Sequence, residues 1–317
     1  MTKKLVSIIV PAYNEEDNVE YCYGELKKIT DTLSDSYNFE FIFTDNASTD
    51  RTFDLLEKLA EKDERIRIFS FSRNFGYQKS IHTGYNKAEG DCAIEYDCDL
   101  QDPPELLPEF LKHWKEGNQI VYGIRKTRRE GKFITFLRKV FYRFINKISE
   151  HTLPEDAGDF MLIDKVIINE IKKRQDQHPY LRGMIFSFGF NQKGVPYDRN
   201  ERKHGKTKFS LKKMLGLAVD GIISQSIVPL RIASYTGIIV ALITVFLSGF
   251  YIVERLFFGL DWPAGWTTTV VLLLFSISLN ALFLGIIGEY LLRIYNQVRN
   301  KSVTIIKKEI DRNLENK

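Results

Sequence analysis

Three aspartates lie close together in the segment YDCDLQDPPE, at positions 97, 99 and 102. They follow an apolar stretch, DCAIE, that is typical of a strand entering a core. Residues at i and i+2 of an extended chain face the same way, so Asp97 and Asp99 can converge on one point and Gln101 can join them. A hard divalent cation such as Mg²⁺ would cancel this charge. Alternatively, acidic residues at strand ends only cap turns, and Asp102, before Pro103, is expected to cap the next helix.

A rigid scaffold must position these side chains, and the sequence up to residue 125 alternates between two kinds of pattern. The expected strands are residues 5–13, 39–46, 65–73, 91–99 and 118–125, and the expected helices are 17–34, 51–63, 78–89 and 104–116. This alternation predicts an α/β fold with a mainly parallel sheet, in which ligands bind at the carboxyl ends of the strands. The polar segments AYNEE, TDNASTD, SRNFG and YDCDLQD all fall there, which favours one shared site.

Composition narrows the class of protein. The chain has 317 residues, enough for a catalytic domain and a smaller part, and its net charge of +4 does not indicate nucleic acid as a partner. The three cysteines form no CxxC pair, which fits reduced thiols in the cytosol. The amino-terminal apolar run meets acidic residues without a small-residue cleavage site, so we expect a buried strand there and not a signal peptide.

Two long runs near the carboxyl end contain no charged residue, namely residues 232–253 and 264–288. Each exceeds the roughly 20 residues that a helix needs to cross a bilayer, so two transmembrane helices in a hairpin are expected. The alternative is a pair of buried core helices. Trp262 and Trp266 would anchor the hairpin at the far interface.

Basic residues flank the hairpin on one side, while the connecting loop holds only Arg255. The flanking residues are Lys206, Lys208, Lys212, Lys213 and Arg231 before the first run, and Arg293, Arg299, Lys301, Lys307 and Lys308 after the second. By the positive-inside rule, the amino-terminal domain and both termini are cytoplasmic. We expect an integral protein of the cytoplasmic (inner) membrane with two spans.

The segments SIIVPAYNEE, TDNASTD and SRNFG, together with the acidic block, resemble the inverting glycosyltransferases of family 2, which have a GT-A fold that binds a nucleotide-diphospho-sugar. DLQDPPE, GDFMLID and RKHGKTKF, followed by two apolar runs, resemble the branch that glycosylates polyprenyl phosphates, with its bactoprenol glucosyltransferases and dolichol-phosphate mannose synthases. The resemblance covers essentially the whole chain.

The resemblance implies a donor site. It assigns the nucleotide-sugar to Pro11, Tyr13, Glu15, Asp45 and Asp97, and a Mg²⁺ or Mn²⁺ ion against the diphosphate to Asp97, Asp99 and Gln101. The chain departs from the commoner DDGS by reading DNAS, with Asn46 and Ala47, so Asp45 is the firmer donor contact. Asp50 is expected to cap the following helix.

The resemblance also implies a catalytic site formed by Asp159 and Asp99. Asp159 would act as a general base or position the acceptor; a phosphate monoester, with a second pKa near 6, is already largely dianionic and hardly needs a base. Direct attack by the phosphate would invert the anomeric centre, and a fixed cation would stabilise the leaving diphosphate.

Basic residues must hold the phosphates and meet the membrane. Arg125, Arg138, Arg202, Lys206 and Lys208 are the candidate phosphate ligands. Arg138 lies in residues 132–149, where apolar and basic residues alternate at helical spacing, as in a helix at a membrane interface; a core helix with a charged outer face is the alternative.

The expected organisation is a catalytic domain at 1–208, an amphipathic interface segment at 209–230, the two spans within 231–292, and a tail at 293–317. The tail either adds a strand or contacts a neighbouring subunit. The expected reaction moves one hexose to a polyprenyl phosphate, with glucose from UDP-glucose and undecaprenyl phosphate as the first choice and mannose or another sugar as alternatives. A catalytically silent scaffold that binds nucleotide-sugar is the rival class. Membrane lipids are expected partners, and a homo-oligomer such as a tetramer is expected.

Overall fold

The computed structural model describes residues 2–126, 154, 157–174, 179–200, 228–258, 265–298 and 303–311. The chain divides into two compact units. The first comprises residues 1–146, 151–211 and 301–317, and the second comprises 147–150 and 212–300. Each unit is described separately below.

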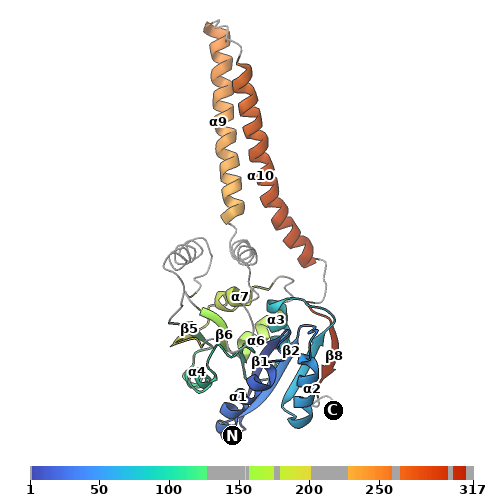
Figure 1. The fold of residues 1–317 in the computed structure, drawn as a ribbon. Helices are drawn as coiled ribbons and strands as arrows, with labels where there is room; N and C mark the ends of the chain where they lie inside the picture. Colours follow the sequence, from blue (N-terminus) through green and yellow to red (C-terminus); the bar gives the residue numbers. More distant parts are fainter. Residues whose placement is uncertain are drawn as a thin grey trace. The chain divides into compact units, whose positions relative to one another are not determined.

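The first unit is built on one mixed sheet in the order β7-β5-β6-β4-β1-β2-β3-β8 (Figure 1). Its strands are β1 (Lys4–Ala12), β2 (Tyr37–Asp45), β3 (Ile66–Phe71), β4 (Cys92–Glu95), β5 (Ile120–Arg125), β6 (Ala157–Asp164), β7 (Gln192–Tyr197) and β8 (Ile306–Ile310). The central strands β4, β1, β2 and β3 are parallel, whereas β6 runs antiparallel to β4 and β5, and β8 runs antiparallel to β3. The parallel centre confirms the alternating pattern expected from the sequence.

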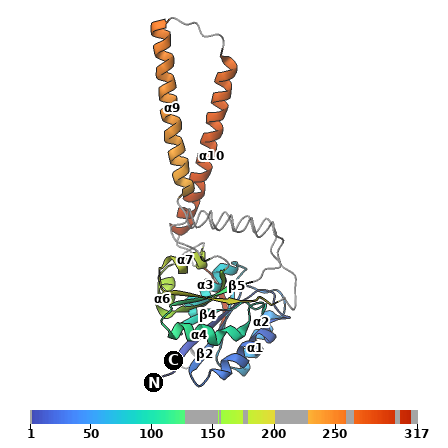
Figure 2. The same ribbon diagram turned by 90° about the vertical axis from the view of Figure 1, so that its left-hand side faces the viewer.

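Helices cover both faces of this sheet. They are α1 (Val19–Thr32), α2 (Thr52–Lys62), α3 (Tyr77–Lys87), the 3₁₀ turn η1 (Pro104–Leu106), α4 (Leu107–Lys115), α6 (Lys165–Lys173) and α7 (Leu181–Ser187). Figure 2 shows α1, α2 and α4 on one face and α3, α6 and α7 on the other. Strand side chains such as Val6, Ile8, Phe41 and Ile94 are fully buried between the layers, so the sheet is a rigid platform for residues at its edge.

The last strand brings the carboxyl-terminal segment back to the sheet of the first unit. β8 pairs with β3, which confirms the first of the two alternatives expected for the tail, an added strand. Its end is fixed by a buried ion pair, because Arg67 contacts Asp311 at 2.8 Å and Glu40 at 2.6 Å and all three residues are under 9 % exposed.

The substitution Asp311→Asn removes one carboxylate from this buried guanidinium. Breaking a buried pair typically costs about 3 kcal/mol or more, so a clear loss of stability is expected, moderated here because Glu40 remains. The free energy of unfolding in urea would measure it. Glu309→Gln, which affects only the partly exposed pair with Lys87, is the control and should lose less than about 1 kcal/mol. Equal losses in the two variants would contradict the role of Arg67.

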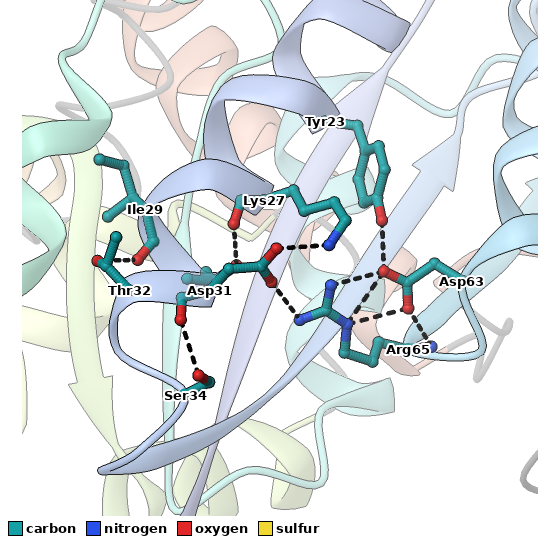
Figure 3. A network of polar contacts seen from close by, with 9 residues as sticks. Tyr23, Lys27, Ile29, Asp31, Thr32, Ser34, Asp63 and Arg65 are labelled. Carbon is teal, nitrogen blue, oxygen red and sulfur yellow. Dashed lines mark hydrogen bonds and ion pairs between the residues drawn. The ribbon is translucent and has the colours of Figure 1, made fainter.

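A second polar network joins α1 to the loop before β3 (Figure 3). Arg65 lies between Asp31, at 3.1 Å, and Asp63, at 2.6 Å, and the Tyr23 hydroxyl donates a hydrogen bond to Asp63. Burial alone would raise the pKa of Asp63, but the hydrogen bonds from Arg65 and Tyr23 outweigh it and hold that pKa well below the usual range.

This pKa predicts how stability depends on pH. The folded state keeps Asp63 ionised to a lower pH than the unfolded chain, whose aspartates titrate near 3.9, so the unfolded state takes up protons first as the pH falls. The contribution of Asp63 is therefore present at neutral pH and is lost progressively below about pH 4. Unfolding free energies of Asp63→Asn and the parent chain should differ by about 1 kcal/mol at neutral pH and converge in acid. A constant difference would contradict this.

The second unit contains two long helices, α9 (Val228–Phe258) and α10 (Trp266–Val298). Among the described residues, one stretch is long and apolar enough to cross a membrane, Phe275–Leu292 in α10. The apolar stretch described in α9, Leu230–Val240, is shorter than a span. The two expected runs are therefore helical, while a hairpin with two spans stays a prediction.

Candidate active site

The candidate site lies at the carboxyl ends of the central strands. β1 has β2 on one side and β4 on the other, so the chain leaves β1 at the point where the strand order reverses. A crevice forms at such a switch point in doubly wound sheets. The segments after β1, β2 and β4 are the ones that carry AYNEE, TDNASTD and YDCDLQD, and the structure brings all three to this edge.

The acidic segment forms a turn. β4 ends at Glu95, and the Asp97 carbonyl accepts a hydrogen bond from the Leu100 backbone N–H at 3.4 Å. Leu100 has a φ of 54°, and the Asp99 carboxylate accepts a hydrogen bond from the backbone N–H of Gln101 at 3.2 Å. The expectation of an extended chain at Asp97 and Asp99 is therefore wrong, because the backbone turns to satisfy its own polar groups.

Asp97 lies in a strongly negative environment. Burial and the carboxylates of Asp99 and Asp102 raise the pKa of Asp97 to about 7, although a hydrogen bond from the Tyr77 hydroxyl at 2.7 Å acts in the opposite direction. Behind it, burial and the charge of Asp97 raise the pKa of Glu95 well above its usual value. Glu95 and Tyr77 are close, with 3.2 Å between Oε1 and the hydroxyl. Neither Glu95 nor Tyr77 is among the residues predicted from the sequence.

Asp102 has a different role from the one expected. η1 begins after Pro103 with no side-chain cap, so the prediction that Asp102 caps a helix is wrong. Asp102 is instead 2 % exposed, lies 3.6 Å from Arg125 and 3.4 Å from Arg199, and accepts a hydrogen bond from the Tyr197 hydroxyl. The carboxylate thereby holds two arginines that come from β5 and from the segment after β7.

Arg125 is the one predicted phosphate ligand that the structure describes. Its Nε donates to the Tyr197 hydroxyl at 3.2 Å, and Gly158 leaves room for its guanidinium, since a Cβ there would lie 3.1 Å from Nη2. Arg138, Arg202, Lys206 and Lys208 lie outside the described residues, as do the expected helix at 132–149 and residues 209–227 of the interface segment.

The residues expected to bind the nucleotide-sugar at the ends of β1 and β2 are held by hydrogen bonds. Asp45 is 1 % exposed and accepts bonds from the Ser48 backbone N–H at 3.0 Å and the Ser70 hydroxyl at 2.7 Å. The backbone N–H of Glu15 donates to the Thr52 hydroxyl at 2.8 Å, and its carboxylate accepts from Asn18 at 2.6 Å.

The structure also describes three other residues for which the sequence predicted a role. Pro11 lies in β1 and Tyr13 directly follows that strand. Asp50 accepts a hydrogen bond from the N–H of Thr52, the first residue of α2, at 3.0 Å, but the N-cap position of this helix is Arg51 and carries no side-chain cap. Direct contacts of these residues with a nucleotide stay predictions.

Asn46 fixes the loop before α3. Its side-chain oxygen accepts the Phe75 backbone N–H at 2.8 Å, so its amide nitrogen faces the Asn74 side-chain oxygen, at 3.1 Å. That oxygen also accepts the Gly76 N–H at 2.9 Å, and Gly76 has a φ of 95°, which suits glycine. The departure from DDGS thus has a structural role: position 46 must donate as well as accept.

Asp159 lies on β6 at the same edge of the sheet. The antiparallel register ends with Glu95 opposite Met161, so Asp159 and Asp97 each lie two residues beyond this last pair. The Oδ1 of Asp159 is 3.2 Å from Nη2 and 3.4 Å from Nε of Arg182, the second residue of α7. Arg182 is not among the residues predicted from the sequence, because no local motif surrounds it.

The residues at this edge fit a divalent cation. Within the described part of the chain, no group of three or more His, Cys, Asp or Glu side chains forms a metal-binding cluster. Mg²⁺, however, commonly takes one or two protein carboxylates and completes its shell with substrate phosphates and water. Burial and the carboxylates of Asp99 and Asp102 raise the pKa of Asp97, and the buried Oε2 of Glu95 has no hydrogen-bond partner among the described residues; a cation bound here would favour the ionised form of both side chains.

Comparison with known proteins identifies the family. Residues 7–172 match the family described as "Glycosyl transferase family 2". The chain belongs to glycosyl transferase family 2. This confirms the resemblance seen in the sequence, and together with the doubly wound sheet it supports a GT-A-like α/β fold.

Relatives match along nearly their full length. An uncharacterized glycosyltransferase of Bacillus subtilis, YkcC, is 39 % identical over 95 % of this chain and 93 % of its own. The bactoprenol glucosyl transferase of Shigella phage SfII is 33 % identical over 96 % of this chain and 97 % of its own. Among solved structures, the mannosyltransferase PcManGT from Pyrobaculum calidifontis, in complex with GDP-Man and Mn²⁺, is 19 % identical with a TM-score of 0.47, covering 65 % of this chain and 59 % of its own. That likeness is too distant to assign a donor or a metal.

The substitution Asn46→Asp restores the commoner DD pair and tests the role of the amide. A carboxylate oxygen would then face the Asn74 oxygen, which the Gly76 N–H prevents from turning away. We expect the loop at 72–76 to loosen and nucleotide-sugar affinity to fall about ten-fold, as for the loss of one buried hydrogen bond. Asn38→Asp adds the same charge at the opposite end of β2 and should bind as the parent does. Unchanged donor binding in Asn46→Asp, measured by calorimetry, would contradict the role of the pair.

Proposed function

We propose that this glycosyltransferase moves one hexose, with inversion, from a nucleotide-diphospho-sugar to a polyprenyl phosphate at the cytoplasmic face of a membrane. The observation that carries the proposal is the set of carboxylates at the carboxyl edge of the sheet, which exceeds the nearby basic groups that the structure describes. A divalent cation would offset this excess of negative charge and would also bind the diphosphate of the nucleotide-sugar. Glucose, UDP and undecaprenyl phosphate are the proposed donor and acceptor, supported by the relatives named bactoprenol glucosyl transferase.

Each group of residues has a proposed task. Pro11, Tyr13, Glu15 and Asp45 hold the nucleoside, while Asp97, Asp99 and Gln101 would hold Mg²⁺ or Mn²⁺. When bound, the metal would stabilise the charge that develops on the leaving diphosphate. Arg125 and Arg199, both held by Asp102, supply fixed positive charge beside the phosphates. Arg138, Arg202, Lys206 and Lys208 are proposed to complete the binding of the lipid phosphate.

The acceptor's chemistry requires a membrane attachment. The stretch Phe275–Leu292 is long and apolar enough to span, and large apolar side chains such as Ile238, Leu242 and Phe246 are exposed on α9 as well. We propose two spans, at about residues 232–253 and 264–288, within the organisation 1–208, 209–230, 231–292 and 293–317. The catalytic domain and both termini are proposed to be cytoplasmic, and assembly into a homo-oligomer such as a tetramer is proposed from the family resemblance.

The test is transfer of labelled sugar from a panel of UDP- and GDP-sugars to a short-chain polyprenyl phosphate, with Mg²⁺, Mn²⁺ or EDTA. Transfer from one donor that stops in EDTA is expected, and Asp99→Asn should lower the rate about 10²–10³-fold because charge stabilisation of the leaving group is lost. Asp35→Asn, which removes an exposed carboxylate, is the control. No transfer from any donor by folded protein in lipid would reject the enzyme in favour of a scaffold that binds nucleotide-sugar.

A further inference from the structure

Arg182 is held beside Asp159 by structure on several sides. The Leu181 backbone N–H, one residue before it, donates to the Gln78 side chain on α3 at 3.1 Å. Phe186, on the same helix, packs edge-on against Tyr122 of β5 with 5.1 Å between ring centroids. Leu181 and Ile185 are almost fully buried, whereas the Arg182 side chain keeps 21 % of its surface exposed. The guanidinium is therefore fixed in place and still accessible.

The start of α3 relates Arg182 to the proposed donor site. Gln78, which accepts from α7, directly follows Tyr77, whose hydroxyl donates to Asp97. β6 runs antiparallel beside β4 with Met161 opposite Glu95, so Asp159 and Asp97 each lie two residues beyond the same strand pair. Arg182 thus lies at a defined position next to the carboxylates that would face the diphosphate.

A phosphate acceptor at this position does not need a general base, but it does need a nearby positive charge. The second pKa of a phosphate monoester is near 6, so at neutral pH the nucleophile is mainly a dianion with no proton to give up. That dianion must approach Asp97, Asp99 and Asp159, and like charges repel at short range. A positively charged side chain that binds the dianion therefore assists the reaction more than a carboxylate acting as a general base. A guanidinium suits this task because it binds phosphate oxygens through several N–H groups.

We propose that Arg182 binds the phosphate of the acceptor and that Asp159 is the residue that positions Arg182, not a general base. The inference rests on the proposed function. In the reaction, a phosphate oxygen of the acceptor forms a bond to C1 of the sugar. The bond from C1 to the diphosphate oxygen breaks, its electron pair leaves with the nucleoside diphosphate, and no proton is transferred.

The test uses full-length protein in lipid nanodiscs, the active nucleotide-sugar with Mg²⁺ or Mn²⁺, and short-chain polyprenyl phosphate as the probe. We expect Arg182→Gln to raise the KM for the acceptor about ten- to hundred-fold, as for loss of a charge-assisted contact, with donor affinity unchanged. Arg182→Lys should recover part of the loss. Arg174→Gln, an exposed arginine that stacks on Phe188 just after α7, is the matched control and should behave as the parent does.

Asp159→Asn separates positioning from base catalysis. We expect a raised acceptor KM, a smaller effect on kcat, and a pH–rate profile parallel to that of the parent, because the acid limb belongs to the acceptor phosphate. Loss of about 10²–10⁴-fold in kcat together with disappearance of that limb would assign Asp159 as the base and overturn the inference. An unchanged acceptor KM in Arg182→Gln would overturn it as well.

The parent chain distinguishes this inference from the proposed function. If the parent transfers sugar and Arg182→Gln is unaffected, only the role of Arg182 fails. If the parent transfers nothing to the polyprenyl phosphate, the proposed function fails and the inference falls with it. Thermal unfolding of each variant in the same nanodiscs identifies any change that reflects misfolding. If Arg182→Gln does not fold, the acceptor KM of Arg182→Lys, which keeps the charge, tests the role of Arg182 instead.

Discussion

Negative charge gathered at one edge of the sheet is the constraint on which the site depends. Asp97 and Asp99 follow β4, Asp159 lies on the neighbouring strand β6, and Glu95 is buried at the end of β4. Such a group is costly to keep close together in a folded protein. The fold offsets part of this cost with arginines from distant segments, since Asp102 lies close to Arg125 and Arg199 and Asp159 to Arg182. A buried, stiff sheet is needed because repelling groups would otherwise move apart.

The start of α3 connects the two halves of the site. On one side, Asn46 and Asn74 fix the loop that leads into it, next to the end of β2. On the other, Tyr77 and Gln78 reach Asp97 and α7. The two sets of hydrogen bonds are joined through the backbone of residues 74–78, which runs from the expected nucleoside side to the expected acceptor side. A small displacement of this helix would therefore move groups in both halves together.

The sequence predicted the central strands, their helices and the polar segments at their ends, because periodic apolar patterns and local turns are encoded within a few residues. It failed where contacts are remote. Asp102 reads as a helix cap beside Pro103, yet its partners Arg125 and Arg199 are separated from it along the chain. Arg182 has no motif of its own, and its importance emerges only when α7 packs against α3 and β5. The strand at 306–310, by contrast, was among the expected outcomes for the tail.

The position of β8 near the end of the chain affects how the sheet forms during synthesis. β8 covers the outer side of β3, which would otherwise present an unpaired backbone edge. It follows α10 in the chain, so the ribosome must complete both long helices before the sheet can acquire its last member. During synthesis the sheet therefore carries an open edge at β3 until residues 306–310 have emerged, and unpaired strand edges of this kind are prone to associate with other chains.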